Sequence, residues 1–409
     1  TPVAPPPVSS EAPLNLSVAL VRIQGANIRL VEAGRPNKPE FKDVNFELRN
    51  FSSTAAMPFS LDVTSGGGGT LKLTGTAGPI AKAKTEQSPF DAQIEIAKLD
   101  IAGSGFTDPA AGLAGLISFK GTANSNGATA AIKGAVTLDN LKLSKTGKAA
   151  TRPVAANIAL VHNLATRHGE VARSIVKLGS ASATVVGSYN LAANPPAIDA
   201  KLTGPNMSLT ELAAFLPMFD IVLPAGATIG SGTASLDVAS KGTLAKLNTS
   251  GSIKLEKAQL SNYDLGSKLR LIGQFAGIPT GPTTEIQLLG ASFESTPAGT
   301  TVRDIQLVAP ALAQITGQGS VSPDHALDFH MRATIKTAGL LAAAMQQKGD
   351  ASTVPFVIQG TSSNPSFKPD LKSFGNEKLQ QAMKNPEGAI KTAKGILDLF
   401  KKAPKQESK

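Results

Sequence analysis

The feature that most constrains this chain is a period-two alternation of apolar and polar residues that returns in segment after segment. In ALDFHMRATIK, the apolar residues Leu327, Phe329 and Met331 alternate with polar residues such as His330. Successive side chains of a β-strand point to opposite faces, so this pattern is typical of strands with one apolar and one polar face. Turn-forming Gly, Asn, Asp and Pro punctuate these segments throughout the chain. The sequence therefore predicts a mainly β, antiparallel protein.

The sequence offers few helices to cover so many apolar strand faces. Hydrophobic residues make up 41% of the 409 residues, but aromatic residues only 4%, so aliphatic side chains must build the apolar faces. An amphipathic sheet has to bury its apolar face, and two arrangements do this. The sheet can close on itself as a sandwich or barrel, or it can form an elongated, curled trough whose lining stays partly open. Periodicity alone leaves both arrangements open.

An internal repeat divides the strand-rich part of the chain into similar units. Residues 115–144 align without gaps with residues 232–261, so that Gly115 matches Gly232. A repeat of this length implies that each unit stacks on its neighbours. The predicted organisation is a Pro-rich linker at 1–13, a domain of repeated β-meanders at 14–365 with units of about 14–116, 115–216 and 232–345 and a closing strand at 354–360, and a basic helical tail at 366–409.

Each unit is expected to end in one short helix. Ser208 and Glu211 have the spacing of a capping box, in which each side chain satisfies a backbone N–H at the helix start. Thr337 is the matching cap of the third unit. In the first unit, Thr107 is the expected cap and Pro109 the expected first-turn residue.

The inward-facing members of the alternating sets are the candidate binding residues. An open face of Ile, Leu, Val and Ala offers little hydrogen bonding, so it suits acyl chains. The predicted lipid-lining residues are Ile94, Ile96, Leu99, Ile101, Val136, Leu138, Leu141, Leu143, Ile253, Leu255, Leu327, Phe329 and Met331.

The C-terminal segment NPEGAIKTAKGILDLFKK predicts a basic amphipathic helix. Of the net charge of +10, half lies between residues 368 and 409, where ten Lys and five acidic residues give 10 − 5 = +5. Such a helix can lie on an anionic membrane surface, bind a partner protein, or cap the open end of the sheet. The predicted contact residues are Ile390, Lys391, Lys394, Leu397, Phe400, Lys401 and Lys402.

We expect no catalytic residues, metal site or cofactor. His162, His168 and Glu170 lie close in sequence, but their spacing fits no common zinc motif. The glycine-rich segment at 65–70 lacks the lysine and following helix of a phosphate-binding loop. The chain has no Cys, which excludes disulfides and thiolate metal sites. Outside the basic tail the charge is nearly balanced, which argues against nucleic-acid binding.

The closing phrase VPFVIQGTSSNPSFKPD, residues 354–370, resembles the C-terminal motif of the AsmA family, a strand followed by a P-x-F-x-P-D exit. Residues 187–217 resemble that family's glycine hairpin, aliphatic-Asp strand and short helix. Residues 230–269 resemble its central glycine-spaced strands and the segment that follows them. The resemblance covers nearly all of residues 14–375.

The resemblance implies a periplasmic protein of Gram-negative bacteria, tied to the inner membrane by an N-terminal helix that this sequence does not include. It also implies a trough-like sheet of the kind found in bridge-like lipid-transfer proteins. The expected function is therefore non-catalytic handling of phospholipid or another acyl lipid in outer-membrane homeostasis. The alternative is a scaffold or assembly factor for outer-membrane biogenesis, with a closed β-sandwich core and no ligand.

Overall fold

The structure is a computed structural model that describes residues 18–31, 38–81, 84–243, 245–270, 278–334, 353–370 and 373. The predicted linker at 1–13 lies outside these residues, and so does the helix expected after Thr337. Every predicted residue of the tail helix, from Ile390 to Lys402, also lies outside them, so the helical tail stays a prediction.

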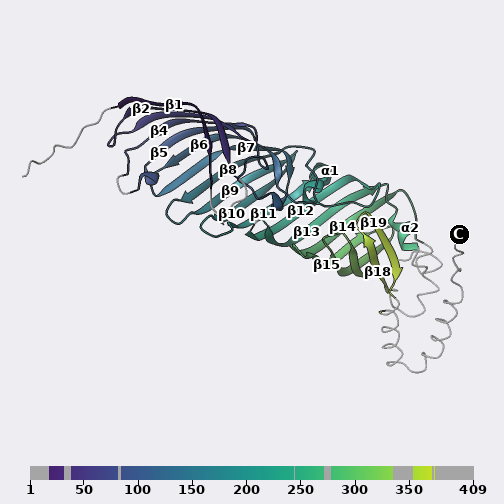
Figure 1. Ribbon diagram of the computed structural model, residues 1–409. Helices are drawn as coiled ribbons and strands as arrows, with labels where there is room; N and C mark the ends of the chain where they lie inside the picture. The colour runs from purple at the N-terminus through teal and green to yellow at the C-terminus, as the bar shows by residue number, and fades with distance from the viewer. Residues whose placement is uncertain are drawn as a thin grey trace, which may run out of the picture. The chain divides into compact units, whose positions relative to one another are not determined.

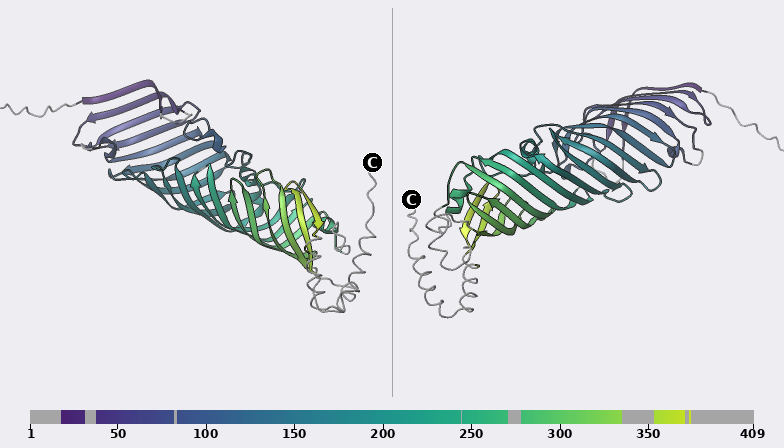
Figure 2. Two further views of the ribbon diagram at one scale, coloured as in Figure 1. Left: turned by 60° about the horizontal axis from the view of Figure 1, so that its bottom comes forward. Right: turned by 180° about the vertical axis from the view of Figure 1, so that it is seen from behind.

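The described residues form one antiparallel sheet of 19 strands that is not closed into a barrel. Wherever the register is resolved, each strand pairs with the next along the chain, as a meander does (Figures 1 and 2). The strands are β1 (Val18–Arg29), β2 (Glu40–Phe51), β3 (Met57–Ser65), β4 (Thr70–Ala77), β5 (Phe90–Asp100), β6 (Ala114–Ser125), β7 (Thr129–Lys142), β8 (Val154–Asn163), β9 (His168–Leu178), β10 (Ala181–Asn190), β11 (Ala197–Ser208), β12 (Thr228–Thr243), β13 (Lys246–Ser261), β14 (Thr283–Thr296), β15 (Gly299–Ala309), β16 (Ala313–Val321), β17 (Leu327–Thr334), β18 (Thr353–Thr361) and β19 (Asn364–Pro369).

The helices within the described residues are few and short. They are α1 (Leu209–Ala213), α2 (Leu265–Arg270), and the 3-10 turns η1 (Thr85–Gln87), η2 (Pro109–Ala111) and η3 (Leu216–Phe219). The prediction of a mainly β, antiparallel protein with few helices is confirmed. The described strands all belong to a single sheet, so no second sheet packs against it among the described residues.

The chain divides into two compact units. Unit 1 comprises Thr1–Met207, Glu211–Ile221 and Ala239–Leu247, and unit 2 comprises Ser208–Thr210, Val222–Val238 and Asn248–Lys409. Unit 1 thus holds β1 to β10 and β11 as far as Met207, and unit 2 holds most of β13 and all of β14 to β19. Each unit is described by itself below. The boundaries of the three sequence repeats stay a prediction.

The sequence repeat coincides with a repeated backbone feature. Gly115 and Gly232, which match in the alignment, both have positive φ angles, of 140° and 113°. A Cβ on Gly115 would lie 3.2 Å from the Cα of Leu141, and one on Gly232 would lie 2.6 Å from the Cα of Ala258, the residue that matches Leu141. Each glycine therefore allows the same close approach of two strands.

Bulges explain where the alternation shifts. Lys98 on β5 has φ of 50°, and Asn140 on β7 has φ of 52°. The pairing registers shift at both positions, so one extra residue is inserted and the apolar face resumes after a three-residue step. Ile96 and Leu99 therefore share a face despite their odd spacing.

Pro109 is the first residue of η2, as predicted, but side chains beside the predicted caps make other contacts. The cap of η2 is Asp108, whose Oδ1 accepts the N–H of Ala110 at 2.8 Å, while the hydroxyl of Thr107 donates to the carbonyl of Ile101. Glu211 accepts hydrogen bonds from Arg152 at 2.7 Å and from the N–H of Ser180 at 3.1 Å. Glu211 thus connects α1 to loops that are distant in sequence. The capping-box spacing of Ser208 and Glu211 does not predict these contacts.

The closing phrase forms a hairpin. The predicted closing strand is confirmed as β18, and the exit expected to end the pairing is itself a strand, β19. The N–H of Asp370 donates to the carbonyl of Pro355 on β18, so alternation turns the backbone nitrogens of Pro365 and Pro369 away from β18. The outer side of β19 thus lacks two donors, which opposes pairing with a further strand.

Candidate functional site

Aliphatic side chains align from strand to strand across unit 1. Residues that pair directly across an antiparallel ladder project from the same face, so the registers can be followed as rows. One row runs Ile23, Phe46, Leu61, Leu73, Ile94, Gly121, Gly134, Ile158. A second runs Val63, Leu71, Ile96, Phe119, Val136, Ala156, Val176, Ala183. A third runs Leu48, Phe59, Gly75, Ala92, Ala123, Ile132, Leu160, Val171, Gly187, Ala200. We call these rows the unit 1 apolar face.

Much of the unit 1 apolar face remains in contact with solvent. Ile94 and Ile96 are only partly buried, and their polar neighbours Gln93 and Glu95 on the other face are exposed. On β1, Ile23 is 44% exposed. The described residues of unit 1 place no second sheet over these rows. Six members of the second and third rows are nevertheless buried, namely Val63, Ala92, Phe119, Ala123, Val136 and Ala183. The face is therefore an aliphatic surface of buried and partly exposed side chains, and its partly exposed area is of the kind that often marks a binding surface.

Most of the predicted lining residues of unit 1 lie on this face. Ile94, Ile96 and Leu99 lie on β5, and Val136, Leu138 and Leu141 lie on β7. Val136 and Leu141 are buried, so these two side chains are part of the core of unit 1 and not of its accessible surface. The two remaining residues do not extend it. Ile101 lies in the turn after β5, and Leu143 lies beyond the end of β7 and is 38% exposed. In both cases the apolar alternation of the sequence extends beyond the last residue of the strand.

Unit 2 also has an apolar face. One row of paired residues runs across this face from partly exposed side chains to fully buried ones. That row runs Leu255, Leu289, Leu307, Ile315, Ala333, Val354. Leu255 is partly exposed, as is Ile253 on the same strand, whereas Ala333 is fully buried. The predicted residues Ile253 and Leu255 therefore lie on an accessible apolar surface.

Helix α2 covers the other end of the unit 2 face. It contributes to a core that we call the unit 2 cluster, made of Leu265, Leu269, Ile278, Ala313, Ile315, Met331, Ala333, Val354, Phe356 and Phe367. Leu269 and Phe356 are among the largest fully buried side chains. The predicted lining residue Met331 belongs to this core, Phe329 packs against it, and Leu327 lies on the same face of β17 but only partly buried. Met331 and Phe329 thus stabilise the fold of unit 2.

Asp264 fixes the start of α2. Its carboxylate accepts hydrogen bonds from the N–H of Ser267 at 2.8 Å, the hydroxyl of Ser267 at 2.6 Å and the N–H of Gly281 at 3.0 Å. Burial raises the pKa of Asp264, but these hydrogen bonds outweigh it and hold the pKa below its ordinary value. The sequence analysis missed this cap, although Asp264 followed by Leu265 and Leu269, four residues apart, is a recognisable helix-start signal.

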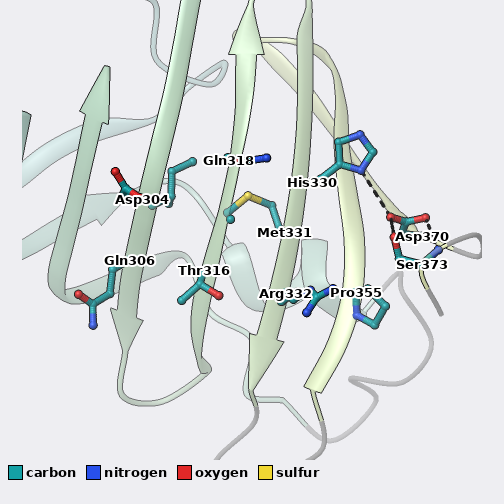
Figure 3. A pocket seen from close by; sticks show the side chains of 12 residues that line it. Asp304, Gln306, Thr316, Gln318, His330, Met331, Arg332, Pro355, Asp370 and Ser373 are labelled. Carbon is teal, nitrogen blue, oxygen red and sulfur yellow. Dashed lines mark hydrogen bonds and ion pairs between the residues drawn. The ribbon is translucent and has the colours of Figure 1, made fainter. Parts of the chain in front are cut away.

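A shallow pocket lies over β15 to β18 and is lined by polar side chains (Figure 3). His330 Nδ1 lies 3.5 Å from a carboxylate oxygen of Asp370, which also accepts the hydroxyl of Ser373 at 2.6 Å. The bonds from Ser373, and then the contact with His330, hold the pKa of Asp370 below its ordinary value. These contacts fasten the segment after β19 to the polar face of β17, where the sequence placed His330.

The histidines singled out in the sequence do not converge. His162 pairs with Gly169, and His168 pairs with Asn163. His162 and His168 therefore lie on opposite faces of the sheet and cannot bind one metal ion together. Within the described residues, no group of three or more His, Asp or Glu side chains is placed to hold a metal, and no helix is long and apolar enough to cross a bilayer.

Comparison with known proteins gave no match to a family model, to a curated protein or to a solved structure.

Proposed function

We propose that this chain is a non-catalytic lipid-handling protein that binds the acyl chains of phospholipids on its apolar sheet face. The observation that carries the proposal is the unit 1 apolar face, in which every member of the row from Ile23 to Ile158 stays at least partly exposed. Acyl chains match such a surface because their binding depends on buried apolar area and requires few hydrogen bonds.

The mechanism is partition, with no covalent step. Each methylene group transferred from water to the face contributes at most about 0.8 kcal/mol, so a chain of many methylenes accumulates useful affinity. Adjacent strands repeat the same chemistry about every 4.8 Å. A bound chain can therefore shift from one strand to the next without passing a polar barrier, which suits transport along the sheet.

The resemblance of residues 354–370 and of the preceding segments to the AsmA family supplies the cellular part of the proposal. It supports a periplasmic protein anchored to the inner membrane, acting in phospholipid transport or homeostasis between the inner and outer membranes. The scaffold alternative predicts a chain that carries no lipid.

Lipid content of the purified chain tests the proposal. Native mass spectrometry and solvent extraction should find phospholipid on the wild-type protein. Ile94→Lys places a charge on the apolar face and should reduce the bound lipid several-fold. Gln93→Lys adds the same charge to the adjacent, exposed position on the polar face and should change little.

Two outcomes would contradict the proposal. A wild-type chain that takes up no phospholipid from vesicles would favour the scaffold. Equal lipid loading of folded Ile94→Lys and Gln93→Lys proteins would show that lipid binds elsewhere.

A further inference from the structure

Two polar aromatic side chains interrupt the unit 1 apolar face near one of its margins. His162 on β8 and Tyr189 on β10 pair with the same residue, Gly169 on β9, from its two sides. All three therefore project from one face of the sheet. His162 and Tyr189 are each second from the end of their strands, which end at Asn163 and Asn190. The pair thus lies between the ends of these strands, which border solvent, and the aliphatic rows.

The two side chains are held together across the intervening strand. Their rings lie nearly parallel, with an interplanar angle of 8° and centroids 5.6 Å apart. A Cβ on Gly169 would overlap the ring of Tyr189, so this position has to be glycine for the phenol to lie flat over β9. The position of the Tyr189 hydroxyl is therefore set by the backbone below it and by the imidazole beside it.

Both members of the pair have unused hydrogen-bonding capacity. The Nδ1 atom of His162 is buried and has no hydrogen-bond partner. The hydroxyl of Tyr189 makes no hydrogen bond among the residues that the structure describes, and it is not one of the buried unpaired atoms, so it is accessible to a ligand. Buried polar groups are usually paired, so an unpaired one indicates a missing ligand or water. Burial raises the pKa of Tyr189, and the phenol therefore keeps its proton at neutral pH and can donate.

We propose that the His162–Tyr189 pair is the binding site for the ester region of an acyl lipid, with the Tyr189 hydroxyl donating to an ester carbonyl oxygen. The inference rests on the proposed function, because the acyl chains would lie on the adjoining aliphatic rows. The ester group is the junction between a polar head and apolar chains, and the pair occupies the corresponding junction of the face. The lipid head then projects past the strand ends into water.

The test compares a diacyl phosphatidylglycerol with its diether analogue, which has the same head and chains but no carbonyl. The wild-type chain should bind the diacyl lipid roughly fivefold to tenfold more tightly, the expected effect of one hydrogen bond. Tyr189→Phe removes only the hydroxyl and should bind both lipids with the affinity of the diether. Tyr263→Phe is the matched control, because it makes the same change at the chain's other tyrosine, which packs against the unit 2 cluster.

The outcomes separate this inference from the proposed function. If the wild-type chain binds neither lipid, the proposed function itself fails. If it binds both lipids equally, or if folded Tyr189→Phe keeps the preference for the diacyl lipid, the lipid-binding face stands and the ester site is overturned. Loss of the preference in Tyr263→Phe as well would also overturn it, because the effect would then not be specific to Tyr189.

Discussion

The apolar faces of unit 1 and unit 2 are built from the same alternating pattern but differ in their cover. Ile94 and its row neighbours on unit 1 remain partly exposed, whereas Phe356 on unit 2 is 1% exposed beneath α2. In unit 2, α2 contributes Leu265 and Leu269 to the unit 2 cluster, whereas every member of the unit 1 row from Ile23 to Ile158 stays at least partly exposed. The same alternating pattern therefore builds fully buried rows in one part of the sheet and partly exposed rows in another.

Truncation in the covered region should have the largest effect. Phe356→Ala removes a ring from the unit 2 cluster and should lower the free energy of unfolding by about 3–5 kcal/mol. Val357→Ala, at the adjacent residue on the opposite face, should cost less than about 1 kcal/mol. Urea unfolding of both variants measures the difference, and equal costs would mean that the cluster is not a packed core.

Leu269→Ala tests whether α2 is the cover. The side chain is fully buried, so its truncation should cost about 2–5 kcal/mol. Weakening α2 should also uncover the row that includes Ile315 and Ala333 and thereby increase binding of a hydrophobic dye. Calorimetry gives the first quantity and dye fluorescence the second. A destabilised variant with unchanged dye binding would show that the row stays covered without the helix.

Asp264→Ala should have a smaller, pH-dependent effect. Loss of the cap of α2 should cost about 1 kcal/mol at neutral pH. The folded-state pKa of Asp264 is lowered, so its contribution is fully present above the ordinary carboxyl pKa of about 3.9 and is lost as the pH falls through the lowered value. Thermal melts of wild type and variant should converge in acid. A gap that persists below the folded-state pKa would assign the effect to packing.

Ile94→Ala on the open face should have the smallest effect. Its side chain is partly exposed already, so truncation removes less buried area and leaves no closed cavity. The expected loss of stability is about 1 kcal/mol or less. Gln93→Ala serves as the control in the same unfolding assay. A loss comparable to that of Phe356→Ala would show that the unit 1 face is a core after all.

The period-two pattern was sufficient to predict a mainly β fold and the shared face of most of the predicted lining residues. Leu99 was placed correctly across the bulge at Lys98 because apolar residues resume on the same face after it. Ile101 and Leu143 were misplaced because alternation does not mark where a strand ends. The pattern also could not distinguish open from covered segments. Phe356 shares the unit 2 cluster with Leu265 and Leu269, and packing between segments so distant in sequence leaves no local signal.

The helix caps and the closing phrase show the same limit. Thr107 and Asp108 are both plausible caps in sequence, and only the backbone geometry selects Asp108. Proline removes a backbone donor from a strand, yet Pro365 and Pro369 both fit within β19 because their nitrogens face outward. Likewise, the stacking of His162 on Tyr189 depends on the strand between them, which spacing along the chain does not report.

Photo-crosslinking to lipid tests the central claim most directly. Benzoylphenylalanine would replace Ile96 and Ile253 on the apolar faces, and Glu95 and Ser252 at the adjacent exposed positions. After irradiation with phospholipid vesicles, mass spectrometry should find lipid adducts at Ile96 and Ile253 and few or none at Glu95 and Ser252. Equal adducts at all four positions, or none at Ile96 and Ile253, would contradict an apolar face that carries acyl chains.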